Sequence, residues 1–305
     1  MTDLRNIYNQ VLDHYYGCDV ENANINEVWS NTLAVKGRVY SMEQLADALS
    51  PGNVVRADIY DFNRFVDPAT VDLLDPVISR LVESGESKFA NPLRDVSISG
   101  KRFSSKYLSN VLQASDIIGF LNSRGVNSPR IMEIGGGVGL LLQTLRRYYG
   151  DRATLFAVDL PETLLIQEWL LRNWFPDLQL VYKGTSQTVS FVVGGINLIN
   201  AYILDSQDIP LDCVININSF QEMDKDTCAA YLDYAAKHLS SEGIIYLENH
   251  FGHGDSSVSE PTEHRLDENL TTLSADIRFQ TDTLHANESL RLVLGKASSS
   301  EDVQS

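Results

Sequence analysis

The 305-residue chain has few cysteines and no long apolar run. Cys18, Cys213 and Cys228 lie far apart and form no CxxC pair, so the sequence predicts neither a disulfide framework nor a zinc knuckle. No apolar stretch approaches the roughly 20 residues that a membrane helix requires, and the first residues lack the pattern of a signal peptide. We therefore expect a cytoplasmic protein that does not bind membranes.

Basic residues are also scarce. The chain has 24 Lys and Arg against 41 Asp and Glu, a formal net charge of −17, so we expect no nucleic-acid partner. One stretch departs from this balance, because Arg94, Lys101, Arg102 and Lys106 have only Asp95 as an acidic neighbour. Two interpretations are open: an ordinary solvated loop, or a contact with the phosphate of a nucleotide-linked substrate.

The apolar pattern changes near Arg130. Before this point helical periodicity recurs in separate pieces, and we expect residues 1–125 to form a mainly helical region that covers the substrate. Over residues 126–296 strand candidates alternate with helices, which is typical of a parallel sheet covered on both faces. The polar residues 297–305 are expected to be a disordered tail.

The elements of the second region follow a regular order. We predict strands at 130–134, 153–159, 213–218 and 244–248, a further strand within a less regular stretch that ends at 200–204, and helices at 107–121, 140–149, 162–175 and 226–239. Residues 276–284 and 290–294 predict a terminal hairpin. The predicted fold class is α/β, a Rossmann-like parallel sheet with an antiparallel terminal hairpin.

A glycine-rich segment follows the first of these strands, with the sequence Glu133-Ile-Gly135-Gly136-Gly137-Val-Gly139. Glycines let the backbone approach a ligand closely, and the helix that follows presents free N–H groups. A dinucleotide-binding GxGxxG pattern would require Gly or Ala where the chain has Leu140. The spacing therefore disfavours NAD and favours the pattern Glu-x-Gly-x-Gly-x-Gly.

Asp159 ends the next predicted strand, twenty positions after Gly139. A carboxylate at this place can accept hydrogen bonds from both ribose hydroxyls of an adenosine. With this spacing the sequence resembles the class I S-adenosylmethionine-dependent methyltransferases. The resemblance implies S-adenosyl-L-methionine as the cofactor, and it implies that family's sheet with an antiparallel last strand.

Four segments narrow the resemblance to the sugar O-methyltransferases of bacterial polysaccharide and natural-product biosynthesis. They are Asn91-Pro92 with Ser104 to Leu108, Met132 to Gly137, Asp159 to Gln167, and Asn218 to Met223, within a match over about residues 90 to 250. Asn249 also fits, because the family usually ends its fifth strand with Asn. The resemblance implies O-methylation of a sugar hydroxyl, which is free, nucleotide-linked or part of a glycoside.

The same resemblance implies a set of cofactor-binding residues. They are Glu133, Gly135, Gly136, Gly137 and Gly139 at the methionine end, Asp159 at the ribose, Asp205 and Ser206 beside the adenine, and Asn218 after the fourth strand. Two alternatives stay open. In the first, Glu133 is a surface carboxylate near a helix start and does not bind the cofactor. In the second, Asp205 belongs to an ordinary turn and does not border the adenine.

Methyl transfer to oxygen is an in-line displacement that needs an aligned hydroxyl and a group to accept its proton. Such a base belongs at the carboxyl ends of the strands, where the chain offers Glu222, His250 and His253. Of the two histidines we favour His250 as the base. The alternative is that both histidines belong to a mobile polar loop and have no catalytic role. The alternative for Glu222 is a loop carboxylate favoured by the dipole of the next helix.

A magnesium ion held by Glu222, Asp224 and Asp226 is a competing mechanism. We favour a helix cap for Asp224 or Asp226 and expect no metal. Two other functions stay open as well. They are O- or N-methylation of another small molecule, and a binding protein that kept the fold without catalysis. A homodimer is compatible with the sequence.

Overall fold

The computed structural model describes the backbone of residues 96–98, 101–103, 105–137, 139–160, 163–164, 167–168, 171–172, 175–183, 190–250, 269–281 and 286–296. Side chains are described within these ranges except at 96–98, 101–103, 105–108, 278–281 and 286–288. The helices predicted before residue 96, the predicted tail 297–305, Arg94 and His253 lie outside the described residues.

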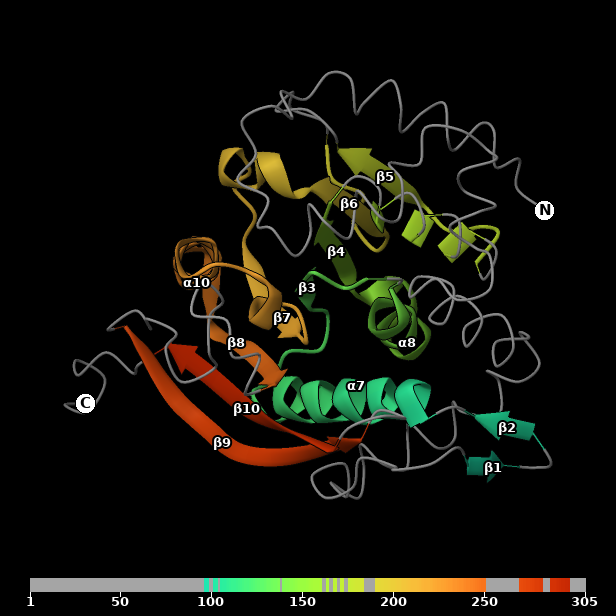
Figure 1. Ribbon diagram of the computed structural model, residues 1–305. Helices are drawn as coiled ribbons and strands as arrows, with labels where there is room; N and C mark the ends of the chain where they lie inside the picture. Colours follow the sequence, from blue (N-terminus) through green and yellow to red (C-terminus); the bar gives the residue numbers. More distant parts are fainter. Residues whose placement is uncertain are drawn as a thin grey trace, which may run out of the picture.

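Eight described strands form one mixed sheet in the order β5-β6-β4-β3-β7-β8-β10-β9 (Figure 1). Their bounds are β3 Arg130–Ile134, β4 Thr154–Asp159, β5 Leu180–Lys183, β6 Ile196–Asn200, β7 Leu211–Ile217, β8 Leu239–His250, β9 Leu270–Thr281 and β10 Ala286–Lys296. The pairs from β5 to β8 are parallel, whereas β10 runs antiparallel to both β8 and β9. The described chain therefore has the predicted Rossmann-like fold with an antiparallel terminal hairpin.

The direction in which the chain extends this sheet reverses at β3. From β3 the chain moves outward through β4 to the edge strand β5 and places β6 between β4 and β5. It then returns to place β7 on the other side of β3 and continues to β8. In open α/β sheets, ligands bind outside the carboxyl ends of the strands at such a reversal. The carboxyl ends of β3 and β7 are therefore where a site is expected.

Helices cover both faces of the sheet. Helices α7 (Ser105–Ser123) and α8 (Leu140–Tyr149) pack on one face, and α10 (Lys225–His238) packs on the other (Figure 1). None of the described helices is long and apolar enough to cross a membrane.

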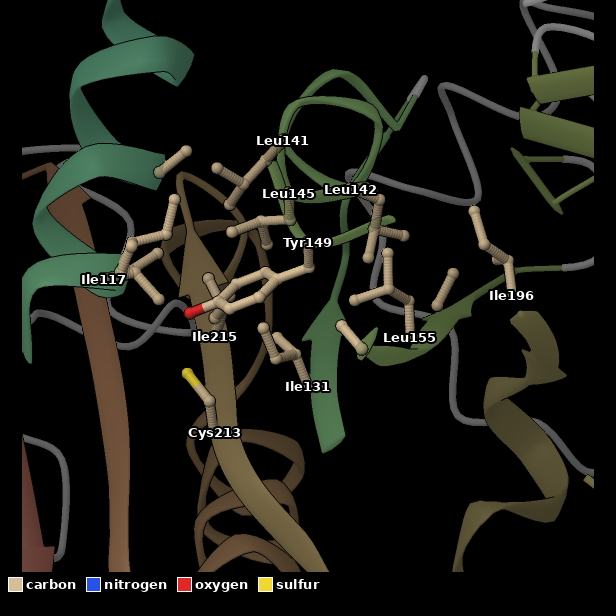
Figure 2. Packing of buried hydrophobic residues seen from close by; sticks show 14 of the residues in the cluster. Ile117, Ile131, Leu141, Leu142, Leu145, Tyr149, Leu155, Ile196, Cys213 and Ile215 are labelled. Carbon is tan, nitrogen blue, oxygen red and sulfur yellow. The ribbon is translucent and has the colours of Figure 1, made fainter. Parts of the chain in front are cut away.

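Alternation along the strands explains why both faces are apolar. In β3, Ile131 belongs to the cluster under α7 and α8, whereas Met132 and Ile134 belong to the cluster under α10. Successive strand side chains point to opposite faces, so a strand buried on both faces is apolar at nearly every position. Figure 2 shows the first cluster, where Ile117 of α7 and Tyr149 of α8 meet residues of the strands.

Local patterns predicted several elements accurately. The strand at 130–134 and the helix at 140–149 are confirmed residue for residue. The helix predicted at 107–121 is confirmed and is slightly longer, since α7 spans Ser105–Ser123. Within the helix predicted at 162–175, residues 163–164, 167–168 and 171–172 are helical.

Other predictions were incomplete. The strand predicted within the stretch that ends at 200–204 is β6, and it ends at Asn200. The Asn200 side chain accepts a hydrogen bond from the Tyr202 N–H and so caps the 3₁₀ helix η4 (Ala201–Ser206). The edge strand β5 was not predicted. A short hairpin of β1 (Val96–Ile98) and β2 (Lys101–Phe103) lies within the region predicted to be mainly helical.

Candidate functional site

The glycine loop links the carboxyl end of β3 to α8. Gly135, Gly137 and Gly139 have φ angles of 70°, 58° and 79°, in the left-handed region that favours glycine. Gly136 is required for space instead, because a β-carbon there would lie 2.6 Å from the Glu133 carboxyl carbon. The loop backbone therefore lies directly against the Glu133 carboxylate.

Glu133 is almost completely buried, with 4% of its surface exposed. Its pKa is raised to about 8, mainly by burial and also by the nearby Asp159 charge, while a hydrogen bond from the Leu142 N–H in the first turn of α8 lowers it. Among the described residues, its Oε2 atom has no hydrogen-bond partner. The alternative of a surface carboxylate is therefore wrong, and one carboxylate oxygen is unsatisfied beneath the glycine loop.

Asp159 ends β4 and is also buried. Its oxygens accept hydrogen bonds from the N–H groups of Gly137 at 3.1 Å and Leu160 at 2.8 Å. The pKa of Asp159 is raised to about 7, mainly by burial and also by the negative charge of Glu222, while these two N–H groups and the Thr163 hydroxyl lower it. The effect of Glu222 shows that it lies within electrostatic range of Asp159.

Gln167 was not among the predicted site residues, but it fixes the loop. Its Nε2 donates to the carbonyl of Gly137 at 2.6 Å and makes a longer contact of 3.5 Å with Asp159 Oδ2. The signal for this residue was a lone amide in the otherwise apolar run Leu-Leu-Ile-Gln, which ends one of the segments of the family resemblance.

The loop after β7 carries Asn218 and Glu222, as predicted. Asn218 has a φ of 55°, the one described non-glycine residue in the left-handed region, and its N–H donates to the Glu248 carbonyl at 2.9 Å. Residues Phe220–Glu222 form the 3₁₀ helix η5. The Glu222 N–H donates to the Ser219 carbonyl at 2.9 Å. The Glu222 carboxylate lies within electrostatic range of Asp159.

A buried amide network joins this loop to the neighbouring strands. Asn216 donates to the Ile134 carbonyl at 3.0 Å and to Ser219 Oγ at 2.6 Å. Asn249 Oδ1 accepts hydrogen bonds from the N–H groups of Ser219 and Phe220, both at 3.2 Å. The carboxyl ends of β3, β7 and β8 are therefore fixed to one another.

Asp205 and Ser206 are exposed residues at the end of η4. Burial raises the pKa of Tyr231, and the charge of Asp159 and the more weakly acting charge of Asp205 raise it further. Tyr231 on α10 therefore lies within electrostatic range of both carboxylates, and its ring stacks on Phe220 with centroids 6.1 Å apart. The sequence pattern did not predict Tyr231, which was not distinguishable from a core aromatic residue.

His250 is the last residue of β8, and its N–H donates to Gln221 Oε1 at 2.5 Å. This contact places it next to the loop that carries Glu222. Asp224 caps α10, because its oxygens accept from the N–H of Thr227 at 2.8 Å and from the hydroxyl of the same residue at 2.9 Å. This matches the helix cap expected for Asp224 or Asp226. The described residues contain no group of three His, Cys, Asp or Glu side chains that could hold a metal ion.

The basic stretch is described only in its backbone. Lys101 and Arg102 belong to β2 and pair with Ile98 and Ser97, and Lys106 lies in the first turn of α7.

No family model and no curated protein matches this sequence. Among solved structures, the chain is similar to magnesium protoporphyrin IX methyltransferase from Synechocystis PCC 6803 with bound S-adenosylmethionine, at 11% identity over 76% of this chain and 98% of that chain, with a TM-score of 0.44. It is also similar to the O-methyltransferase TomG from Streptomyces achromogenes, involved in tomaymycin synthesis and in complex with S-adenosylmethionine. That match has 15% identity over 79% of this chain and 96% of that chain, with a TM-score of 0.43. Similarity at this level does not determine an activity, so a functional assignment depends on the chain's own residues.

Proposed function

We propose that this chain is an S-adenosylmethionine-dependent methyltransferase that acts on a small molecule. The observation that carries the proposal is the buried Glu133 carboxylate under a loop of left-handed glycines. One of its oxygens has no hydrogen-bond partner in the part of the chain that the structure describes. A buried carboxylate without a partner is costly, and a bound cation would remove that cost. The ammonium group at the methionine end of the cofactor is such a cation.

The other residues of the carboxyl edge fit the rest of the cofactor. Asp159 ends β4, and the two ribose hydroxyls are proposed to bind its carboxylate, where they would compete with the Thr163 side chain and with the 3.5 Å contact of Gln167. The glycines from Gly135 to Gly139 offer a backbone surface with little side chain, and Asn218 follows β7 at the same edge of the sheet. Asp205 and Ser206 are proposed to border the adenine, and Tyr231 lies within electrostatic range of both Asp159 and Asp205.

S-adenosylmethionine, when bound, supplies a methyl group activated by its sulfonium. The chain must orient the acceptor and take up its proton. Glu222 is proposed to do this because it lies in the loop after β7 and within electrostatic range of Asp159. His250 is the second candidate, since its backbone contacts the same loop, and His253 is the third.

The acceptor is proposed to be a sugar hydroxyl, free, nucleotide-linked or part of a glycoside. The support is the segment Asn218 to Met223, whose residues resemble those of the sugar O-methyltransferases and which follows the carboxyl end of β7.

Calorimetric titration with S-adenosylmethionine tests the cofactor assignment. We expect saturable binding by the wild-type chain, and weaker binding by Glu133→Gln and Asp159→Asn. NAD serves as the control nucleotide. Absence of binding to S-adenosylmethionine, or tighter binding of NAD, would refute the proposal.

Incubation with S-adenosylmethionine and a panel of free sugars, nucleotide sugars and glycosides tests the acceptor class. NMR of the product should show an O-methyl group on a sugar carbon. An N-methyl product, or methylation only of acceptors without a sugar, would contradict the sugar assignment. Glu222→Gln, His250→Ala and His253→Ala then identify the base, and full activity in all three would contradict the base assignment.

A further inference from the structure

The last three residues of β8 hold the loop from Asn218 to Glu222. The Glu248 carbonyl accepts from the Asn218 N–H at 2.9 Å, and the His250 N–H donates to the Gln221 side chain at 2.5 Å. Between them, Asn249 uses its side chain and accepts from two consecutive N–H groups of the loop. The placement of the loop is therefore determined largely by the end of one strand.

Asn249 has a fixed orientation. Its Oδ1 accepts from the N–H groups of Ser219 and Phe220, and its Nδ2 atom is buried without a hydrogen-bond partner within the described ranges. Rotating the carboxamide by half a turn would bring the NH₂ group against two N–H donors. The carboxamide oxygen is thus the atom of this side chain that makes the hydrogen bonds to the loop. The residue is 1% exposed.

The two loop N–H groups depend on Asn249 to different degrees. The Phe220 N–H is shared with Asn216 Oδ1 at 3.1 Å, so it keeps an acceptor when Asn249 is changed. The Ser219 N–H donates to Asn249 Oδ1 and has no second acceptor among the described residues. Ser219 in turn lies against the glycine loop, because a β-carbon on Gly135 would come within 2.6 Å of the Ser219 β-carbon. A displaced Ser219 would therefore disturb the loop on the opposite side of the site.

We propose that Asn249 is a positioning residue of the methyl-transfer site, whose side-chain oxygen fixes the Asn218–Glu222 loop against the glycine loop. This inference rests on the proposed function. It explains how Asn218 is held in a left-handed conformation, which a non-glycine residue keeps only where its surroundings impose it. It also gives Glu222 a defined place relative to Asp159.

The test uses two substitutions at Asn249. Asn249→Asp keeps an acceptor oxygen and removes no hydrogen bond made among the described residues. Because the position is buried, the new carboxyl group should be protonated and uncharged near neutral pH, so it replaces the carboxamide with a group of similar size and the same charge. Asn249→Leu has a similar volume but no acceptor. The control is Asn197→Leu, which removes another buried carboxamide near the start of β6 that bonds Val192 and the Leu155 carbonyl.

Calorimetry with S-adenosylmethionine provides the main readout, and urea unfolding checks the fold of each variant. We expect Asn249→Leu to weaken binding roughly tenfold, the usual effect of one lost buried hydrogen bond. Asn249→Asp should stay within about threefold of the wild-type chain. Asn197→Leu should lower the urea midpoint without changing the affinity. If Asn249→Leu does not fold, Asn249→Ser, whose hydroxyl is too short to reach both N–H groups, takes its place.

Three outcomes would overturn the inference. They are unchanged affinity in the folded Asn249→Leu or Asn249→Ser variant, equal weakening by Asn249→Asp, and equal weakening by the Asn197→Leu control. Each of these is distinct from failure of the proposed function, in which the wild-type chain itself would not bind the cofactor.

Discussion

Two buried polar clusters among the described residues differ in how their charged groups are hydrogen-bonded. At the carboxyl ends of the strands, Glu133 is 4% exposed, and one of its oxygens has no partner among those residues. Between α7 and the end strands, Arg291 is 3% exposed and donates to Asp116 at 2.9 Å, Asp276 at 2.7 Å and Ser274 at 2.8 Å. Equal burial therefore accompanies opposite degrees of pairing.

The second cluster continues through hydrogen bonds to β8. The Tyr246 hydroxyl bridges Asp116 at 3.2 Å and Glu248 at 3.0 Å, and Gln113 donates to Glu248 at 3.1 Å. This cluster ties helix α7 to the sheet, and its carboxylates are hydrogen-bonded to Arg291, Tyr246 or Gln113 inside the protein. A buried charge alone thus does not mark a binding site, and a buried carboxylate oxygen without a hydrogen-bond partner is the more specific signal.

The largest loss of stability is expected in the cluster around Arg291, where the buried cation is fully hydrogen-bonded. Arg291→Met should destabilise the protein by about 3–5 kcal/mol, because it leaves Asp116 and Asp276 without their cation. Urea unfolding measures the loss. The matched control is Arg124→Met, which removes the ion pair to the exposed Glu242 and two hydrogen bonds to the carbonyls of Ser241 and Glu242, and which should cost about 1–2 kcal/mol. Equal losses in the two variants would show that Arg291 does not act as a buried structural cation.

Substitution of two glycines of the loop distinguishes the free-energy cost of backbone strain from the cost of a steric clash. Gly135 and Gly137 are both left-handed, but only Gly135 faces a neighbour, Ser219, where a β-carbon would be placed. Gly135→Ala should destabilise by about 2–4 kcal/mol and weaken cofactor binding, whereas Gly137→Ala should cost about 1 kcal/mol. Thermal unfolding measures both variants. A larger loss for Gly137→Ala would contradict the contact between the loops.

A smaller effect is expected at the helix cap. Asp224→Ala should destabilise by about 1 kcal/mol, because the Thr227 N–H loses its acceptor. Cofactor affinity, measured by calorimetry, should not change. A loss of magnesium-dependent activity in this variant, in place of a loss of stability, would revive the metal hypothesis for Glu222, Asp224 and Asp226.

Features set by neighbouring residues were predictable from the sequence. The glycine loop, its strand and its helix follow from apolar spacing within twenty residues, and Asp159 follows from its place after the next strand. Asn218 and Glu222 were predicted because the carboxyl ends of parallel strands share one edge.

Features that depend on distant pairing were not predictable. The Gln113–Glu248 hydrogen bond joins residues 135 positions apart, and the acceptors of the Ser219 N–H depend on where β8 ends. β8 itself was predicted as 244–248 but spans Leu239–His250, because polar Ser240 and Glu242 break its apolar pattern without breaking the strand.

The central claim is that Glu133 is a buried carboxylate that a cationic cofactor satisfies. Burial raises the pKa of free Glu133 to about 8, so the group is mainly protonated at pH 7, and a bound cation favours its ionised form. Cofactor binding should therefore release protons below pH 8, and affinity should rise with pH by up to about tenfold per unit.

The most direct test is calorimetric titration with S-adenosylmethionine at pH 7 in two buffers of different ionisation enthalpy. The account predicts proton release by the wild-type chain, and both weaker binding and smaller release by Glu133→Gln. Binding without proton release, equal in the two proteins, would contradict it.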